Sequence, residues 1–436
     1  MIQLLIIADD FTGALDSGVQ FAACGARTLV VVGAEASFDT DAAVLVVDAE
    51  TRHLSARQAY EAVYRLTAGA MEAGVSCVYK KTDSALRGNI GAELTAVLEA
   101  SGEAQLPFLP AFPQIGRTTE HGVHLISGVP VAESVFGTDP FEPVRHSDLA
   151  GLIGEQSDIP VRSLSALADP LPEEPGILVF DCTHEEEMTA AGGRLREAGR
   201  LRVAAGCAGF AAILPGLLGF RRGAGARIPA LDPRLLVVSG SVNPITAGQI
   251  REASRRGFCH MRLTPEQTLA PGYWASAEGA EAMRSIRTRL RESPLCIIDT
   301  NDSRTEPYAR GRGIDTDGIR LGVARSVGRV VREIFTDPAL GTLLITGGDT
   351  LLQCMQEMGV SQVEPVCELE AGVVLSRFTY QGCTRYVISK SGGFGKTDLL
   401  TKIAEKISRQ TSADPAPPGA EINIREKRRR TYAEKL

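Results

Sequence analysis

The sequence predicts an α/β protein of two domains, each a mainly parallel sheet flanked by helices, with the active site in the cleft between the domains. At 436 residues the chain is too long for one ordinary hydrophobic core. Short apolar runs alternate with helical patterns in both halves, which is typical of parallel sheets covered by helices. A stretch rich in Gly, Arg and Pro, residues 219–233, separates the two halves.

These signals divide the chain into four parts. We expect a first domain over residues 1–218, a linker over 219–233, a second domain over 234–410 and a tail over 411–436. The tail is Pro-rich and then basic, and this composition predicts disorder. We interpret it as a solvated tail in preference to a nucleic-acid-binding segment.

The composition is that of a globular protein, with 44% apolar residues, 23% charged residues and a formal net charge of −7. This negative charge gives no reason to expect nucleic acid or a membrane surface as a partner. Nine cysteines are scattered singly without a CxxC pair, which predicts buried thiols in a reducing, cytoplasmic location. Residues 203–220 carry no charge, but their glycines and Pro215 favour a buried strand and a short helix over a membrane span.

The first half opens with a continuous apolar run, residues 3–8, which predicts a parallel strand buried on both faces. Similar runs predict strands at 28–32, 44–48, 75–79, 106–109, 177–180 and 203–205. Helical periodicity lies between them, at 14–24, 55–73, 91–100 and 184–198. Residues 123–160 show no regular pattern.

The second half repeats this alternation. Predicted strands occupy residues 235–238, 295–299 and 342–345, and a strand pair occupies 372–378 and 384–389. Predicted helices occupy 246–256, 315–334, a segment that ends near residue 358, and 398–409.

Residues 79–94, YKKTDSALRGNIGAEL, concentrate polar groups between a predicted strand and a predicted helix. Three side chains can pair with an anion: Lys80, Lys81 and Arg87. Four can hydrogen-bond hydroxyl groups: Thr82, Asp83, Ser84 and Asn89. The free N–H groups of a helix start also favour anions. The stretch therefore suggests a pocket for a small, acidic, hydroxylated molecule, and the alternative is a solvated loop before a helix.

Other polar side chains follow neighbouring predicted strands. They are Asp9, Asp10, Arg52, Lys81, Asp83 and Arg117. In parallel α/β sheets, ligands bind beyond the carboxyl ends of the strands. This placement favours the pocket over the solvated loop.

Three small, polar loops follow predicted strands of the second half. They are Ser239-Gly240-Ser241, Gly347-Gly348-Asp349-Thr350 and Ser391-Gly392-Gly393. Glycine-rich turns that open helices direct backbone N–H groups at one point, which is how phosphates are bound. One such loop is weak evidence because Gly also serves ordinary turns, but three in one domain favour a nucleotide site. Lys396 does not complete a P-loop, because Lys390 stands where that motif needs its first glycine.

A hydroxy-acid pocket in one domain and a phosphate site in the other suggest phosphoryl transfer, which depends on positioning and charge stabilisation. The carboxylate that orients or deprotonates the attacking hydroxyl would come from Asp9, Asp10 or Asp83. The cations would come from Arg52, Lys81 and Arg87, with Mg²⁺ on the nucleotide. The sequence lacks HExxH and GxSxG motifs and has no GxGxxG after its first strand, which disfavours metalloprotease, esterase and dehydrogenase chemistry.

The motifs resemble those of the four-carbon acid sugar kinase family. Ile7 to Ala14 with Asp16 resembles the N-terminal signature of that family, and Lys81 to Gly91 resembles its second motif. Later motifs match in order at 113–119, 239–241, 346–350 and 389–395. The resemblance covers about residues 1–410.

The resemblance implies an ATP-dependent kinase that phosphorylates the 4-hydroxyl of a four-carbon sugar acid, with a sugar-acid-binding first domain and a nucleotide-binding second domain. Asp10 and Asp83 are the candidate catalytic residues. The expected substrate contacts are Asp9, Arg52, Lys81, Thr82, Ser84 and Arg87. The expected ATP contacts are Ser239, Gly240, Ser241, Gly347, Gly348, Asp349, Thr350, Gly392 and Gly393. No metal ligand is assigned.

The form of the second motif is closer to D-threonate and D-erythronate kinases than to 3-oxo-tetronate kinases. A 3-oxo-tetronate 4-kinase and a kinase of another small hydroxy acid remain alternatives. So does a nucleotide-regulated protein that binds a sugar acid without transforming it. The expected partners are the sugar acid and ATP. A homodimer is compatible with the sequence, which does not set the oligomeric state.

Overall fold

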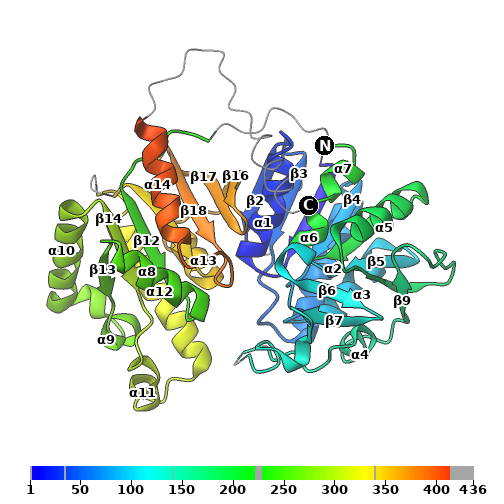
Figure 1. Cartoon of the computed structure of the whole chain (residues 1–436), viewed down its shortest axis with the longest axis horizontal. Coiled ribbons are helices and arrows are strands. Elements are labelled where there is room, and N and C mark those ends of the chain that lie inside the picture. The colour runs from blue at the N-terminus through cyan, green and yellow to red at the C-terminus, as the bar shows by residue number, and fades with distance from the viewer. Residues whose placement is uncertain (1, 34–35, 140, 221–227, 338–339, 413–436) are drawn as a thin grey trace, which may run out of the picture.

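The computed structural model describes residues 2–33, 36–139, 141–220, 228–337 and 340–412, and these form two α/β lobes (Figure 1). The N-terminal lobe contains eight strands of the main sheet: β1 (Leu4–Ala8), β2 (Thr28–Val32), β3 (Val44–Asp48), β4 (Cys77–Lys81), β5 (Gln105–Leu109), β9 (Val161–Ser165), β10 (Gly176–Asp181) and β11 (Val203–Gly206). Its α-helices are α1 (Phe11–Ala22), α2 (Ala56–Glu72), α3 (Ile90–Ser101), α4 (Leu149–Gly154), α5 (Glu185–Glu197), α6 (Ala208–Ala211) and α7 (Leu214–Leu217).

A small antiparallel sheet and two 3₁₀ turns complete this lobe. They are β6 (Arg117–Glu120), β7 (Val123–Ile126), β8 (Val129–Pro130), η1 (Pro113–Ile115) and η2 (Val131–Glu133). Strands β7 and β8, the η2 turn and helix α4 lie within residues 123–160, where the sequence shows no regular pattern. Residues 221–227 of the predicted linker and residues 413–436 of the predicted tail lie outside the described residues.

The C-terminal lobe contains seven strands: β12 (Leu235–Ser239), β13 (Cys259–Arg262), β14 (Leu295–Asp299), β15 (Thr342–Thr346), β16 (Gln362–Glu370), β17 (Val373–Tyr380) and β18 (Cys383–Lys390). Its helices are α8 (Pro244–Arg255), α9 (Pro265–Leu269), η3 (Tyr273–Ala275), α10 (Ala277–Glu292), α11 (Thr305–Arg310), α12 (Thr316–Ile334), α13 (Gly348–Glu357) and α14 (Leu399–Ser412).

The predicted strands and helices are confirmed, and most bounds agree within two residues. Two bounds differ by three residues: α1 begins at Phe11 instead of residue 14, because Asp10 caps it, and α14 ends at Ser412 instead of residue 409. Strand β4 runs two residues further than predicted and includes Lys80 and Lys81. Strands β9, β13 and β16 were not predicted, because polar or charged residues interrupt their sequences and leave no continuous apolar run.

Parallel pairing aligns the ends of the central strands in the N-terminal lobe. The strand order is β2-β3-β1-β4-β11-β5-β10-β9, and every neighbouring pair is parallel. Ala8, the last residue of β1, faces Asp48 on one side and Lys81 on the other. The residues that follow these three strands therefore leave the sheet at the same level.

The C-terminal lobe has the same feature in β12, β15 and β18, which are parallel to one another. Ser239, Thr346 and Lys390 end these strands and lie opposite one another in register. Strands β17 and β16 continue the sheet with antiparallel pairing. The three glycine loops therefore begin side by side.

The two sheets are joined edge to edge into one sheet of fifteen strands. The joint is a short antiparallel pairing in which Gln362 faces Val31 and Val363 faces Val30. Figure 1 shows β2 beside β16 at the centre of the molecule. Register shifts after Pro365 and Glu368 bend β16. This pairing covers an edge strand of each domain, which sequence patterning had not indicated.

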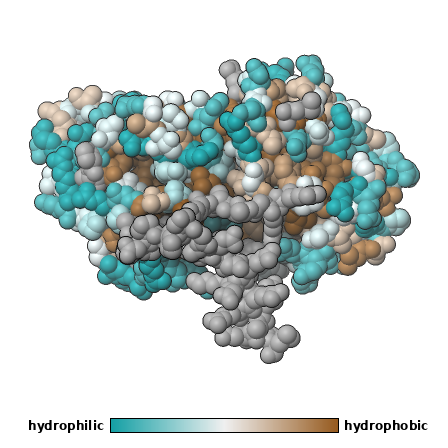
Figure 2. All heavy atoms as spheres, turned by 90° about the horizontal axis from the view of Figure 1, so that it is seen from above, coloured by the Kyte–Doolittle hydropathy of each residue, from teal (hydrophilic) through white to brown (hydrophobic). Residues whose placement is uncertain are grey.

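Residues 203–220 form β11, α6 and α7 instead of a membrane span, as predicted. None of the helices in the described ranges combines the length and apolar character needed to cross a membrane. Seen from above, hydrophilic side chains spread over both lobes, with apolar side chains in smaller groups between them (Figure 2).

Lys80 and Lys81 face opposite sides of the sheet, because side chains alternate along a strand. The Lys80 ammonium lies 3.2 Å from Glu93 Oε2 of α3, and both side chains are fully buried. The Thr51 hydroxyl also donates to Glu93. Burial raises the pKa of the Glu93 carboxyl, even though Lys80 lowers it. Lys80 is therefore part of the core, and the expectation that it pairs with a ligand is not supported.

This ion pair yields a stability prediction. Lys80→Met would leave the Glu93 carboxylate buried without its cation, so we expect the free energy of unfolding to fall by about 3–5 kcal/mol. Urea unfolding followed by circular dichroism measures this change. The double variant Lys80→Met/Glu93→Leu should recover most of it. Arg57→Met removes an exposed pair with Glu61 and should cause no measurable change. Equal losses in Lys80→Met and Arg57→Met would contradict the prediction.

Candidate active site

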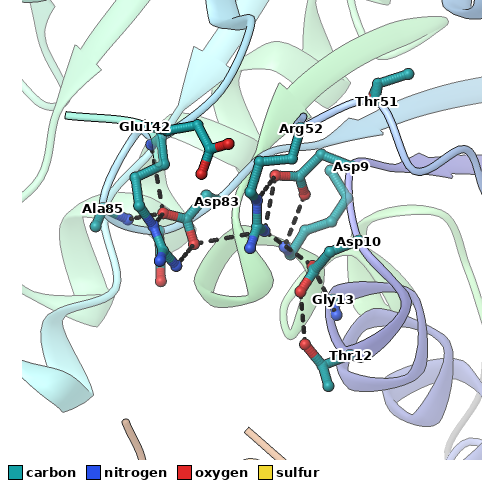
Figure 3. Close-up of polar contacts among 12 residues, drawn as sticks. Asp9, Asp10, Thr12, Gly13, Thr51, Arg52, Asp83, Ala85 and Glu142 are labelled. Carbon is teal, nitrogen blue, oxygen red and sulfur yellow. Dashed lines mark hydrogen bonds and ion pairs between the residues drawn. The ribbon is translucent and has the colours of Figure 1, made fainter. Parts of the chain in front are cut away.

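Arg52 lies at the centre of a buried ion-pair cluster beyond the ends of β1, β3 and β4 (Figure 3). Its Nη2 atom lies 2.9 Å from Asp9 Oδ2 and 3.0 Å from Asp10 Oδ1. The same atom lies 3.7 Å from Asp83 Oδ1, and Nε donates to Asp9 Oδ2 at 3.0 Å. Burial would lower the pKa of Arg52, but Asp10, Asp9 and Asp83 raise it above its ordinary value. One guanidinium thus holds three aspartates from two strand ends.

The turn after β3 directs Arg52 toward these aspartates. Glu50 has φ of +48°, a left-handed conformation that is uncommon outside Gly. The Arg52 N–H then donates to the Asp9 carbonyl at 3.4 Å. Burial raises the pKa of Glu50 to about 7, and burial together with the neighbouring Glu50 raises that of Asp48 well above its ordinary value. A strained turn with two carboxyls is thus held beside the cluster, as is common at functional sites.

Asp10 forms an ion pair with Arg52 and is also the N-cap of α1. Its carboxylate accepts from the Gly13 N–H at 3.0 Å and from the Thr12 hydroxyl at 2.6 Å. Burial would raise the pKa of Asp10, but Arg52 and Lys81 lower it below its ordinary value. Position 13 has no room for a side chain, because a Cβ on Gly13 would lie only 2.5 Å from Lys81 Nζ and from Asp10 Oδ1. The start of α1 therefore fits closely around these two charges.

Asp83 is held by two arginines. Arg87 donates to both of its carboxylate oxygens, at 2.8 and 3.1 Å, and Arg87 also reaches Asp139 at 3.3 Å. Leu86, between them, has φ of +65°, which is strained for a bulky residue. Burial would raise the pKa of Asp83, but Arg87 and Arg52 lower it well below its ordinary value. The Asp83 carboxylate is therefore charged at neutral pH and acts as a counter-ion for both arginines.

The remaining polar groups of this motif have different surroundings. Lys81 Nζ lies 3.8 Å from Asp9 Oδ1. The buried Thr82 hydroxyl has no hydrogen-bond partner within the described part of the chain. The Ser84 hydroxyl accepts from Arg117, and its carbonyl lies 3.1 Å from His124 Nε2. Asn89 donates to the carbonyls of Thr51 and Leu54, so it fixes a loop and does not face the cluster.

The three glycine loops of the C-terminal lobe meet at one place. A Cβ on Gly240 would lie 2.0 Å from Thr350 Oγ1, and one on Gly392 would lie 2.9 Å from Ser241 Oγ. Gly347 has φ of +105°, which favours Gly. Gly240 therefore lies too close to Thr350, and Gly392 too close to Ser241, for either glycine to carry a side chain without a shift of its neighbour. The buried hydroxyls of Ser239 and Thr346 have no hydrogen-bond partner among the described residues.

Lys390 is the last residue of β18, and its side chain holds the Ser391-Gly392-Gly393 loop in place. Its buried ammonium donates to the carbonyls of Ser391 and Gly392 at 2.9 and 3.3 Å and to the Thr246 hydroxyl at 3.2 Å. Burial lowers its pKa to about 7. Thr246 also donates to the Gly392 carbonyl at 2.8 Å. Neither residue was predicted as part of the site, since neither lies in a glycine motif position.

The two groups of side chains lie against each other. A Cβ on Gly348 would be 3.5 Å from Asp10 Oδ2 and 3.6 Å from Thr12 Oγ1. The Ser391 hydroxyl donates to Asp16 Oδ2 at 3.2 Å, and burial raises the pKa of Asp16 to about 7. The start of α1 therefore contacts two of the three glycine loops.

Most of the residues predicted from sequence come together in these two groups. The first holds Asp9, Asp10, Arg52, Lys81, Thr82, Asp83, Ser84 and Arg87, and the second holds Ser239, Gly240, Ser241, Gly347, Gly348, Asp349, Thr350, Gly392 and Gly393. Their roles toward a ligand stay predictions. Lys396 lies outside both groups, as expected from the failed P-loop match, and borders a separate hollow with Arg251 and Arg255.

Metal ligation was left open by the sequence. In residues 2–412, apart from the few positions that the structure does not describe, no cluster of three or more His, Cys, Asp or Glu side chains could hold a metal ion by itself. Mg²⁺ ordinarily binds one or two carboxylates together with substrate phosphates and water. A metal carried by a nucleotide is compatible with this site.

Comparison with known proteins agrees with the division into lobes. Residues 4–214 match the family described as a sugar-binding N-terminal domain, and residues 236–400 match the one described as a nucleotide-binding C-terminal domain. Crystal structures of a Haemophilus influenzae protein (TM-score 0.67) and a Salmonella typhimurium protein (TM-score 0.72) share the fold at 20% identity. They cover 92% and 93% of this chain and 99% and 100% of their own.

Relatives of known name span nearly the whole chain. A D-threonate kinase of Salmonella typhimurium is 33% identical over 92% of this chain and 97% of its own length. A D-threonate kinase of Bordetella bronchiseptica is 29% identical over 92% and 96%. A 3-oxo-tetronate kinase of Methylobacterium radiotolerans is 25% identical over 92% and 98%. The chain therefore belongs to the four-carbon acid sugar kinase family and is more similar to these two D-threonate kinases than to that 3-oxo-tetronate kinase.

Proposed function

We propose that this protein is an ATP-dependent kinase that phosphorylates the 4-hydroxyl of a four-carbon sugar acid of the D-threonate or D-erythronate type. The observation that carries the proposal is the close approach of Gly348 to Asp10, where a Cβ on Gly348 would be 3.5 Å from the Asp10 carboxylate, because it brings the aspartate–arginine cluster next to the glycine loops. The similarity of 33% to a D-threonate kinase over 92% of the chain supports the choice of substrate.

Asp10 is the better candidate for the carboxylate that orients the attacking hydroxyl. Its side chain is 18% exposed, compared with 2% for Asp9 and 9% for Asp83. It is also the aspartate nearest the Gly348 loop. Asp9 and Asp83 instead serve to hold Arg52, Lys81 and Arg87, which provide positive charge beside the transferring phosphoryl group and the substrate hydroxyls.

The glycine loops are proposed to bind ATP. No side chain caps the start of α13, so the first N–H groups of this helix suit phosphate oxygens. Asp349 is the second residue of α13, and its carboxylate pairs with Arg320 at 3.1 Å. Asp349 is the carboxylate of this loop that would contact Mg²⁺ on the nucleotide. The metal would neutralise charge on the phosphates.

Closure of the two lobes around both substrates would exclude water and limit ATP hydrolysis. A cytoplasmic location, the absence of nucleic-acid and membrane partners, a homodimer and the exact domain boundaries also remain predictions from the sequence.

A coupled ADP-release assay tests the proposed activity. We expect ATP-dependent turnover with D-threonate or D-erythronate, and much lower turnover with 3-oxo-tetronate. Preference for 3-oxo-tetronate would place the protein in the other branch. Thermal shifts with sugar acids and no ADP release with any of them would support a binding protein without catalysis, and would contradict the proposed function.

Replacement of Asp10 tests its orienting role. Asp10→Asn keeps the size of the side chain but removes its charge, so we expect kcat/KM to fall by about 10²–10⁴-fold. Calorimetry should give an ATP affinity close to that of the unchanged protein. The control is Asp41→Asn, since Asp41 is exposed and pairs only with Arg27 among the described residues. Near-normal turnover by Asp10→Asn would exclude Asp10 from this role.

A graded replacement tests the Gly348 loop. Gly348→Ala adds a Cβ at ordinary contact distance from Asp10 and should be tolerated. Gly348→Leu fills the space between the lobes, so we expect ATP affinity to fall at least about tenfold, or 1.4 kcal/mol, by calorimetry. Gly193→Leu is the matched control, because a Cβ on Gly193 meets nothing within 4 Å. Unchanged ATP affinity in Gly348→Leu would count against this loop as the nucleotide site.

A further inference from the structure

The cations of the first group differ in whether a carboxylate neutralises them. Arg52 pairs with three aspartates, Lys81 lies 3.8 Å from Asp9, and Arg87 pairs with Asp83 and Asp139. Arg117, in contrast, makes no ion pair with any carboxylate among the described residues. Arg117 borders the first group through Ser84, and unlike Arg52 and Arg87 its guanidinium has no carboxylate within ion-pair distance in the described part of the chain.

Arg117 is nevertheless held in a defined position. It is the first residue of β6, and its backbone forms a bridge with Phe112. Its Nη1 atom donates to the Ser84 hydroxyl, and its guanidinium lies 5.1 Å from the centre of the Phe136 ring. Arg87 lies 5.3 Å from the same ring. An aromatic face beside a cation keeps it in place without neutralising it.

Ser84, which accepts the hydrogen bond from Arg117, is itself held in a defined position. The Ser84 carbonyl lies 3.1 Å from His124 Nε2, and the Thr119 hydroxyl lies 3.1 Å from His124 Nδ1. His124 is buried, and burial lowers its pKa to about 4, so the ring is neutral at neutral pH. The groups of this network are hydroxyls, a carbonyl and a neutral ring, so it places neither a counter-ion nor a competing cation beside Arg117. A partly buried cation that is fixed but unpaired is suited to a ligand anion.

The position of Arg117 relative to Asp10 suggests how an extended ligand would be oriented along the sheet edge. Asp10 follows β1, Ser84 follows β4, and Arg117 lies beyond β5, while the sheet order is β1-β4-β11-β5. Strands β1 and β5 are three strand positions apart, but the Arg117 guanidinium reaches back to Ser84 beyond β4, the direct neighbour of β1. Adjacent strands are about 4.8 Å apart, so the Ser84–Arg117 contact lies roughly one strand spacing from Asp10, which a four-carbon acid can span. The Asp10 end contacts the Gly348 loop, and the Ser84–Arg117 end lies further from it in this order.

We propose that Arg117, oriented by Ser84, binds the carboxylate of the sugar acid and so makes the enzyme select acids over neutral polyols. This inference rests on the proposed function. Arg52 and Arg87 are less suited to the task, because an added anion there would meet the carboxylates that already surround them. The substrate would then lie with its carboxylate at Arg117 and its 4-hydroxyl at Asp10.

The test compares acid and neutral ligands of the same configuration. For Arg117→Met, we expect kcat/KM for the four-carbon acid to fall by about 10²-fold or more, as when one partner of a buried charge pair is removed. Binding of the matching tetritol, measured by calorimetry or as competitive inhibition, should change less than about threefold. Arg117→Lys should recover part of the loss for the acid. ATP affinity and the melting temperature should stay unchanged in both variants.

Arg145→Met is the matched comparison, since exposed Arg145 lines a cavity of about 290 Å³ next to Arg52 and Arg87. Equal losses for acid and tetritol in Arg117→Met would show a general effect on the pocket and overturn the proposal. Loss of acid selectivity in Arg145→Met but not in Arg117→Met would place the carboxylate in the neighbouring cavity and also overturn it. If the unchanged protein releases no ADP, the proposed function fails, but acid binding to Arg117→Met still tests this assignment.

Discussion

The buried cluster around Arg52 is the constraint on which the rest of the site depends. One guanidinium lies within 4 Å of carboxylates of Asp9, Asp10 and Asp83. Removing any partner would leave charge in a buried place, which is costly. The ends of β1 and β4 and the turn after β3 therefore have one arrangement of low energy. The strained turn at Glu50 is maintained by that arrangement.

Helix α1 links the Arg52 cluster to the C-terminal lobe. Asp10 caps the helix and binds Arg52, so the position of the helix is tied to the cluster. Further along, Asp16 accepts from Ser391, and a Cβ on Gly18 would lie 3.3 Å from Pro365 of β16. The antiparallel pairing of β2 with β16 is a further connection between the two lobes. One helix thus connects the acidic cluster with the glycine loops.

The sequence predicts the ends of strands well, because a buried parallel strand is a short apolar run and polar residues mark its end. Asp9, Asp83 and the three glycine loops could be found in this way. It could not show that Lys80 faces the core, because the predicted end of β4 was two residues early and the alternation of faces was lost. The pairing of β2 with β16 depends on contacts between distant segments. The pairing of Arg87 with Asp139 and the contact of Arg117 with Ser84 depend on such long-range contacts too.

The charges that assemble the site also limit the chemistry it can perform. Arg52 and Lys81 lower the pKa of Asp10, and a carboxylate with a lowered pKa is a weak base. For the proposed reaction, early removal of the hydroxyl proton by Asp10 is therefore disfavoured. Phosphoryl transfer passes through a loose transition state in which little covalent chemistry is required of the protein. An aspartate that fixes the direction of the hydroxyl, beside cations that stabilise the transferring group, meets that requirement without being a strong base.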